Sequence, residues 1–351
     1  MLFESLKIKS IHLKNRVVVS PMCQYSSVDG FASDWHLVHL GSRATGGAAL
    51  IIQEATAVSP RGRISPDDMG LWNDRQIEPL KRITRFLNEQ GAVAGIQLAH
   101  AGRKASSSAP WKGGKTITLS EGGWTTEAPS PIPYRESDPL PEELSVAAIS
   151  GIVEDFKSAA ARALKAGFQV LEIHAAHGYL FHEFLSSLSN RRSDEYGGSF
   201  ENRYRMLKET IIAIQTVWPE NLPLFVRISA TDWADGGWNP DDSVRLAAML
   251  KQTGVDLIDV SSGGLVHYQK IPVGPGYQVP FAERIRKETG ILTGAVGLIT
   301  KPVQAEEILS SGKADLILIA RESLRNPNFP LTAAKELGID ISWPVQYVRA
   351  K

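Results

Sequence analysis

Eight short runs of β-branched and aliphatic residues recur along this 351-residue chain, with amphipathic stretches between them. The runs are Arg16–Pro21, Ala48–Thr56, Val93–His100, Val170–Ala176, Pro223–Ser229, Asp256–Ser262, Ile291–Gly297 and Leu316–Arg321. From Ile149 to Leu164 the apolar residues recur at spacings of three and four, the period of one helix face, before Gly167 ends the pattern. Eight alternations of strand and helix predict an α/β protein of the (β/α)8, or TIM-barrel, class.

The chain is longer than the ~250 residues typical of such a barrel, and we expect one domain over residues 1–351. Residues 101–144 are rich in Gly, Pro, Ser and Trp and follow the third run, so they predict a loop that caps the barrel mouth. Residues 7–15 alternate around a tight turn and predict a hairpin at the barrel bottom. No Gly-x-Gly-x-x-Gly follows the first run, which disfavours a doubly wound dinucleotide-binding sheet.

Composition excludes several classes of protein. The formal net charge is zero, which gives no electrostatic reason to bind nucleic acid or an anionic membrane. Cys23 is the only cysteine, so one chain cannot form a disulfide, an iron–sulfur cluster or a four-cysteine zinc site. The N-terminus has no basic region followed by an apolar run, and no stretch reaches the length of a membrane span. We therefore expect a soluble, cytoplasmic protein.

Proton-handling side chains gather after the fourth run. Val170, Glu172 and His174 share one face of that strand, and His177 and Tyr179 follow at its end. Because the active sites of these barrels lie at the carboxyl ends of the strands, this group predicts a catalytic site. One buried histidine with two ordinary loop residues is the simpler alternative. A metal-dependent hydrolase is a second alternative, but strand-borne metal ligands usually occur as His-x-His, which is absent here.

Other strand ends carry groups suited to a phosphate and a polar ring. Gly297 and Arg321 end the seventh and eighth runs, where these barrels bind phosphate through backbone N–H groups. Gln97 and Arg227 lie on inward faces of the third and fifth strands and offer an amide and a cation to a heterocycle. An internal pairing of Arg227 with Glu172 is the alternative, and both interactions can coexist.

Several long segments, in order along the whole chain, resemble the old yellow enzyme family. They are Ser20–Cys23, Gln97–Lys104, Glu172–Leu180, Asp194–Ser199 and Glu201–Arg203. Cys23 with Tyr25, together with Pro344–Arg349, resembles the bacterial, thermophilic-like class of that family.

The resemblance implies an FMN-dependent NADPH dehydrogenase, or ene-reductase, that holds FMN without a covalent bond. NADPH or NADH would reduce the flavin, and an electron-poor alkene (an unsaturated aldehyde or ketone, a maleimide or a nitroalkene) would then accept the hydride through flavin N5 in a ping-pong reaction. By the same resemblance, Cys23 would lie at the N5/O4 edge and Arg227 near N1/O2. The other implied cofactor-binding residues are Ser20, Pro21, Met22, Ala55, Gln97, Ser261, Gly297, Ala320 and Arg321.

The resemblance also assigns the substrate side. His174 and His177 would bind the carbonyl or nitro oxygen, Tyr179 would protonate the α-carbon, and Tyr25 and Lys104 would line the pocket. Two further alternatives remain open. A flavin-binding sensor or carrier would be expected to lack the His/His/Tyr group or Tyr25, which are all present, and Cys23 would otherwise be a small buried hydrophobe.

Two features of the chain's last third bear on this resemblance. The strand-8 end has Ala320 where the family pattern leads us to expect Gly, although the backbone N–H is retained. The tail, residues 344–351, is short and polar, and in this class the arginine that matches Arg349 enters a neighbouring subunit's active site. We therefore expect a homodimer or homotetramer, with a solvated basic tail as the alternative.

Overall fold

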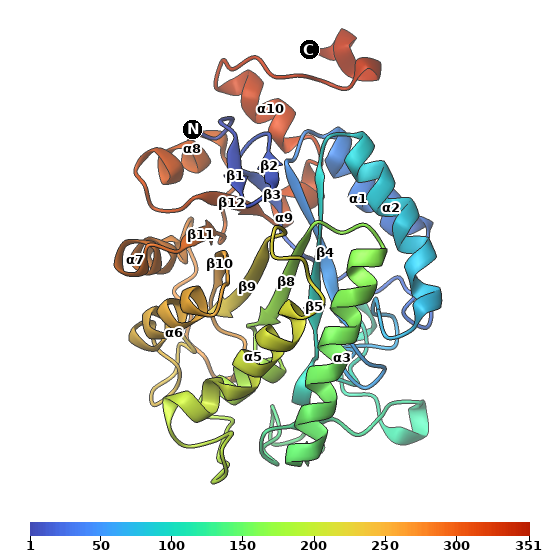
Figure 1. The fold of residues 1–351 in the computed structure, drawn as a ribbon, viewed down its shortest axis with the longest axis vertical. Coiled ribbons are helices and arrows are strands. Elements are labelled where there is room, and N and C mark those ends of the chain that lie inside the picture. Colours follow the sequence, from blue (N-terminus) through green and yellow to red (C-terminus); the bar gives the residue numbers. More distant parts are fainter.

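Eight parallel strands close into a barrel in the computed structural model, which describes residues 1–351 (Figure 1). The barrel strands are β3 Val17–Val19, β4 Leu50–Ala57, β5 Val93–Ala99, β8 Val170–Ala175, β9 Leu224–Ser229, β10 Leu257–Ser261, β11 Leu292–Ala295 and β12 Leu316–Ile319. Each coincides with one of the eight predicted runs. The pairing of Ile317 on β12 with Val17 on β3 closes the circle, so the predicted (β/α)8 barrel is confirmed.

Helices surround the barrel. They are α1 Asp34–Thr45, α2 Ile77–Glu89, α3 Val146–Lys165, α4 Leu180–Leu185, α5 Phe200–Gln215, α6 Pro240–Gln252, α7 Val279–Thr289, α8 Pro302–Ser310, α9 Arg321–Arg325 and α10 Phe329–Glu336. In α3 the Ser145 side chain caps the first turn by accepting from the N–H of Ala148, and the face predicted from periodicity is the buried one. None of the helices combines the length and the apolar character that crossing a membrane requires.

A hairpin closes the amino-terminal end of the barrel. Strands β1 Leu6–Ile8 and β2 Ile11–Leu13 pair antiparallel, which confirms the hairpin predicted over residues 7–15. Ile8, Ile11 and Leu13 are buried against apolar side chains that fill the barrel interior, among them Leu50 and Val170. The opposite end is therefore the one left for a site.

The segment 101–144 lies over that opposite end. It contains the short turns Gly102–Lys104, Pro110–Lys112 and Leu119–Glu121 and the two-residue strands β6 Glu127–Ala128 and β7 Glu142–Glu143. The ring of Trp111 meets Tyr25 edge-on at 5.6 Å between centroids, and the ring of Tyr134 lies 4.8 Å from the ammonium nitrogen of Lys104. The predicted capping loop is therefore in contact with residues of the barrel mouth.

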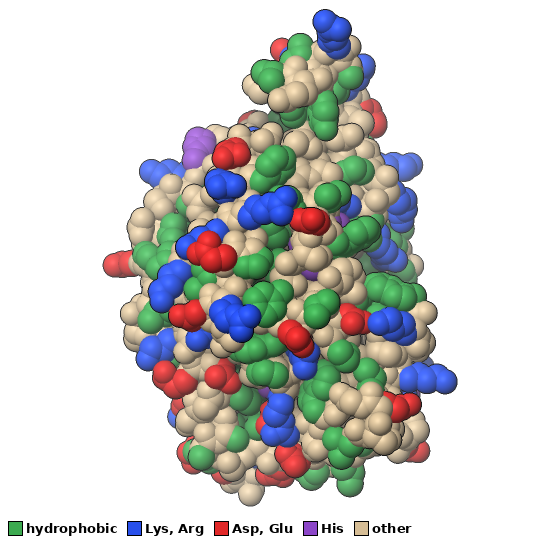
Figure 2. All heavy atoms as spheres, turned by 90° about the vertical axis from the view of Figure 1, so that its right-hand side faces the viewer, with side chains coloured by type: hydrophobic (Ala, Val, Ile, Leu, Met, Phe, Trp, Pro, Cys, Tyr) green, Lys and Arg blue, Asp and Glu red, His purple; other side chains and the backbone are tan.

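The carboxyl-terminal tail lies beyond the other end of the barrel. Its last turn, η5 Val345–Ala350, follows α10 and projects past the hairpin (Figure 1). Residues 340–346 border a cavity of about 750 Å³ together with Lys14, Asn15 and Gln90, which precede β3 and β5. Arg349 is exposed, and the basic tip of the tail stands clear of the body in Figure 2. The tail is thus remote from the barrel mouth of its own chain.

Candidate active site

The two histidines predicted for substrate binding meet at the carboxyl end of β8. Nε2 of His174 lies 3.3 Å from Nδ1 of His177, and Nε2 of His177 lies 2.7 Å from Oγ of Ser261. The N–H of Ala176 donates to Nδ1 of His174, at 3.3 Å. A neutral His174 therefore carries its proton on Nε2 and donates to His177, and His177 in turn donates to Ser261.

Both imidazoles are held in the neutral form. Burial lowers the pKa of His174 and of His177 well below the ordinary value, and the charge of Arg227 lowers both further. A neutral imidazole has one N–H, and on each of these rings that N–H is on Nε2. The pair can therefore offer hydrogen bonds to an acceptor oxygen without adding a full positive charge to the site.

Tyr179 completes this group. Its ring lies edge-on to His174, with 5.0 Å between centroids, and the ammonium of Lys104 lies 5.1 Å from the Tyr179 ring centre. Burial raises the pKa of Tyr179 well above its ordinary value, so the phenol keeps its proton. Lys104 donates to the backbone carbonyls of His177, at 2.8 Å, and Gly264, at 3.0 Å. Burial lowers the pKa of Lys104 to about 8.

Cys23 and Tyr25 lie on the loop after β3. Burial raises the pKa of the Cys23 thiol, as do the nearby charges of Asp68 and Glu54, whereas a hydrogen bond with Tyr25 acts in the opposite direction. The net rise keeps the thiol protonated. Tyr25 has a positive φ of 47°, an uncommon conformation for a side chain of this size. The loop is held by the N–H of Gln24, which donates to Oε2 of Glu54 at 2.6 Å.

A buried polar layer crosses the barrel beneath the histidines. Nε2 of Gln97 donates to Oε1 of Glu172 at 2.8 Å, and Nε of Arg227 lies 2.9 Å from Oδ2 of Asp259. The predicted internal pairing of Arg227 with Glu172 is therefore wrong, because Arg227 pairs with Asp259 instead. Arg227 stands directly opposite Asp259 on β10, while on β8 it stands opposite His174. Nε of Arg227 and both carboxylate oxygens of Asp259 have no hydrogen-bond partner within the protein, so their contact is an ion pair alone.

A separate cavity of about 140 Å³ lies at the ends of β10, β11 and β12. Its lining includes the predicted residues Ser261, Gly297, Ala320 and Arg321, together with Tyr277 and Gln278. Gly297 has φ +125°, and a Cβ built on it would lie 3.1 Å from the Gln278 side chain. A glycine is required here to keep the cradle open. Ala320 has φ −102°, so the position does not need left-handed backbone, but its ψ of −99° lies outside the standard helical and extended regions.

These observations fit the flavin that the resemblance implies. The cavity at the ends of β11 and β12 offers glycine backbone and a basic side chain to a phosphate, and the polar layer offers an amide and a guanidinium to a heterocycle. Residues 20–23 and Ala55 lie at the ends of the neighbouring strands β3 and β4, and the buried Oγ of Ser20 has no partner within the protein. These residues would hold the ring edge.

The structure does not bring every predicted residue together. Arg349 lies in the tail, at the opposite end of the barrel from His174. Sequence reasoning also missed several side chains that contact the site: Trp111, Tyr134, Asp259, Tyr277 and Gln278. Asp259 had a signal, because it shares a strand face with Leu257 and Ser261. The two capping-loop aromatics come from a segment without periodicity, and nothing in the sequence indicated them.

Comparison with known proteins agrees with this geometry. The model of the NADH:flavin oxidoreductase / NADH oxidase family matches residues 1–339. An NADPH dehydrogenase of Listeria innocua is 54% identical over 351 residues, covering 99% of this chain and 98% of the relative. An NADPH dehydrogenase of Geobacillus thermodenitrificans is 53% identical over the same 99% and 98%.

Solved structures give the same result. Morphinone reductase superposes with a TM-score of 0.81 at 27% identity, over 98% of this chain and 91% of its own. The old yellow enzyme homologue of Zymomonas mobilis superposes with a TM-score of 0.79 at 26% identity, over 98% and 94%. The chain therefore belongs to the NADH:flavin oxidoreductase / NADH oxidase family, that of old yellow enzyme, and is an FMN-dependent oxidoreductase that uses a nicotinamide cofactor.

Proposed function

We propose that this protein is an ene-reductase, which uses NADPH or NADH to reduce the activated C=C bond of α,β-unsaturated aldehydes and ketones, maleimides or nitroalkenes. FMN, when bound, would supply the redox chemistry, a ping-pong hydride transfer through N5 from the nicotinamide to the β-carbon. The observation that carries the proposal is the neutral pair His174 and His177 at the barrel mouth, with the protonated phenol of Tyr179 against it.

His174 and His177 bind the acceptor oxygen in this proposal. As hydride reaches the β-carbon, negative charge develops on the carbonyl or nitro oxygen, and fixed N–H donors stabilise that charge. The Nε2–H of His174 now donates to His177, and that of His177 donates to Ser261. An acceptor oxygen would replace these partners. Because both rings are neutral, they stabilise the negative charge that develops on the oxygen by hydrogen bonds and not by a full positive charge.

Tyr179 is the proposed proton donor. A phenol whose pKa is raised by burial is protonated at neutral pH and can transfer its proton to the α-carbon. Tyr25 and Lys104 line the pocket, and the contacts of Lys104 with the His177 and Gly264 carbonyls hold the turn that carries the catalytic group. In this proposal the protonated thiol of Cys23 faces the reactive edge of the ring.

We also propose a homodimer or homotetramer in which Arg349 enters a neighbour's active site. The tail is exposed and lies at the end of the barrel opposite its own mouth, so its arginine is accessible to a second copy and distant from its own site. A guanidinium suits this role because it can stack on a ring and form fixed hydrogen bonds.

Absorption spectra test the reaction. The purified protein should be yellow, with a band at ~450 nm as for oxidised flavins, should bleach anaerobically with NADPH, and should recover on addition of 2-cyclohexenone. A panel of enones, maleimides and nitroalkenes then ranks the acceptors. A bleached protein that no acceptor reoxidises would favour a flavin sensor or carrier.

A further inference from the structure

The turn that carries His177 and Tyr179 has an unusual backbone. His177 has φ +58° and Gly178 has φ +73°, two successive residues in the left-handed region. This conformation is costly for histidine and persists only where surrounding contacts impose it. A Cβ on Gly178 would lie 2.2 Å from the carbonyl oxygen of Gly264, so the turn is also pressed against the neighbouring loop. The contacts that hold it therefore decide where the catalytic side chains point.

Every backbone N–H of residues 176–180 has an acceptor. The pairs are Ala176 with Nδ1 of His174 at 3.3 Å, His177 with Oγ of Ser229 at 2.9 Å, Gly178 with Nδ1 of His182 at 2.9 Å, Tyr179 with the Ala176 carbonyl at 3.2 Å, and Leu180 with the His100 carbonyl at 3.0 Å. The acceptor for Gly178, at the centre of the turn, is a ring nitrogen. It can accept only while it carries no proton.

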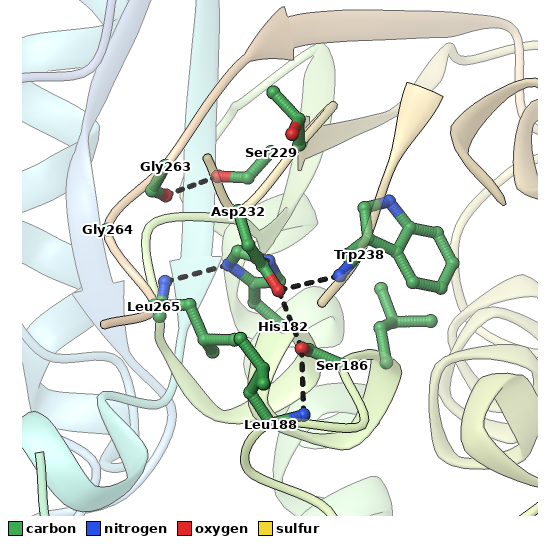
Figure 3. Close-up of polar contacts among 12 residues, drawn as sticks. His182, Ser186, Leu188, Ser229, Asp232, Trp238, Gly263, Gly264 and Leu265 are labelled. Carbon is green, nitrogen blue, oxygen red and sulfur yellow. Dashed lines mark hydrogen bonds and ion pairs between the residues drawn. The ribbon is translucent and has the colours of Figure 1, made fainter. Parts of the chain in front are cut away.

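Asp232 fixes the protonation of that ring. Oδ1 of Asp232 lies 2.8 Å from Nε2 of His182, and both side chains are fully buried. Since Nδ1 accepts from Gly178, the ring proton is on Nε2 and faces Oδ1 of Asp232, at ion-pair distance but outside hydrogen-bond geometry. Figure 3 shows His182 against Asp232, with Ser186 and Trp238 on the far side of the carboxylate. The pair connects the β8 turn to the loop between β9 and α6.

The second carboxylate oxygen of Asp232, Oδ2, fixes the position of the side chain. Oδ2 accepts from Oγ of Ser186 at 2.6 Å and from the N–H of Trp238 at 2.7 Å. Burial would raise the pKa of Asp232, but His182, Ser186 and Trp238 together lower it below its ordinary value. The group is thus a carboxylate with three donors around it: two are bonded to Oδ2, and the Nε2–H of His182 lies beside Oδ1. An amide in its place has one oxygen and cannot accept from all three.

We propose that His182 and Asp232 are positioning residues for the reaction: Asp232 holds His182 in the Nε2–H tautomer, and His182 holds the N–H of Gly178, which sets the orientation of His177 and Tyr179. The inference rests on the proposed function of those two residues. His182 and Asp232 act through the turn and are not themselves catalytic. The competing interpretation is a buried pair that contributes only to stability.

Asp232→Asn separates the two interpretations. If the Asn oxygen stays with Ser186 and Trp238, its NH2 group faces Nε2 of His182, and the ring must move its proton to Nδ1, against the N–H of Gly178. If the amide is reversed, its NH2 group faces the N–H of Trp238 instead. In both orientations one polar contact of this group is lost, although Asn has nearly the same volume as Asp. His182→Asn keeps an oxygen near the position of Nδ1, whereas His182→Leu removes the acceptor.

The measurement uses the FMN-loaded protein, with 15N-labelled histidine and with rapid mixing. In the wild type, the His182 signals, assigned by their absence in His182→Asn, should show the Nε2–H tautomer. Asp232→Asn should shift or broaden them and slow reoxidation by 2-cyclohexenone ~10²-fold, as expected for a misplacement of about 1 Å, with little change in flavin reduction by NADPH. His182→Leu should match it, and His182→Asn should restore much of the rate. Ser186→Ala, which leaves the contact between His182 and Asp232 in place, is the matched control.

Three results would overturn the inference. They are an Nδ1–H or charged His182 in the wild type, wild-type reoxidation in both Asp232→Asn and His182→Leu, and an equal loss of both half-reactions accompanied by loss of FMN in all the variants. The last would make the pair purely structural. A wild-type protein that no alkene reoxidises would instead contradict the proposed function, and the tautomer measurement would still test the hydrogen-bond arrangement by itself.

Discussion

Arg227 and Asp259 stand opposite each other on adjacent barrel strands, with guanidinium Nε 2.9 Å from carboxylate Oδ2. Glu172 lies in the same buried layer, bonded to Gln97, and has no such partner. Burial raises the pKa of Glu172, the nearby charge of Asp259 raises it further, and Arg227 only partly opposes them. The Arg227 guanidinium thus lies near two carboxyl groups, Asp259 and Glu172, and Glu172 is the one that retains its proton.

Glu172→Gln should therefore gain stability relative to the wild type as the pH rises. The folded-state pKa of Glu172 lies above its ordinary value of 4.5, so folding takes up a proton in the range above that value, and wild-type stability falls as the pH rises through it. Gln resembles the protonated carboxyl and does not titrate. Denaturant unfolding of both proteins at pH 5 and pH 8 measures the difference. A difference that does not change with pH would show that Glu172 is ionised in the folded state.

Replacement of either active-site histidine should affect one half-reaction. His174→Ala or His177→Ala should slow reoxidation by 2-cyclohexenone by ~10²-fold or more, as for loss of an oxyanion donor, while reduction by NADPH falls less. Stopped-flow measurement of the two half-reactions tests this. Enone rates equal to that of the wild type in both variants would remove the pair from the acceptor site.

Tyr179→Phe should distinguish two kinds of acceptor. Enones need a proton at the α-carbon, so their reduction should slow strongly when the phenol is removed. Nitroalkenes should be affected less in the hydride step, because the nitronate product is stable enough to leave and be protonated in water. Parallel measurements with 2-cyclohexenone and a nitroalkene make the comparison. The same loss with both acceptors would contradict the role of Tyr179 as proton donor.

Cys23→Ala should shift the midpoint potential of the flavin without loss of FMN. The thiol is protonated, since burial raises its pKa, and a protonated thiol is a weak hydrogen-bond donor to a neighbouring ring edge. Spectroelectrochemical titration of both proteins measures the shift, with FMN content as the control. An unchanged potential and an unchanged spectrum would indicate that Cys23 is only a small buried side chain.

Arg349→Ala should raise KM for the enone and leave association largely intact, whereas deletion of residues 345–351 should also weaken the assembly. The reason is that the tail lies away from its own barrel mouth and can act only on another copy. Gel filtration and steady-state kinetics on the same samples separate the two effects. A fully active monomer at assay concentration would refute the shared site.

Local patterns predicted the fold well. The alternation around Val170 and the spacing from Ile149 to Leu164 are properties of a few adjacent residues, and the structure confirms both the strand and the helix. The partner of Arg227 is a different kind of question. Its strand has a neighbour on each side, one carrying Glu172 and the other Asp259, and only the stagger of the closed barrel sets Asp259 opposite the guanidinium.

Side chains from the capping loop were beyond such reasoning. Trp111 and Tyr134 reach Tyr25 and Lys104 from a segment that has no regular period, so their positions depend on long-range contacts that a sequence pattern does not encode. The His182–Asp232 pair is similar. Its two members are 50 positions apart and come together only because the β8 turn and the loop after β9 are neighbours in the barrel.

The β1–β2 hairpin has a kinetic consequence. With Ile8, Ile11 and Leu13 buried at the amino-terminal end, only the barrel mouth is left for both the nicotinamide and the proposed alkene. Two reactants that use the same opening of the site cannot be bound there at the same time. High concentrations of the alkene should therefore inhibit turnover by occupying the oxidised enzyme, and this inhibition should be relieved competitively by more NADPH.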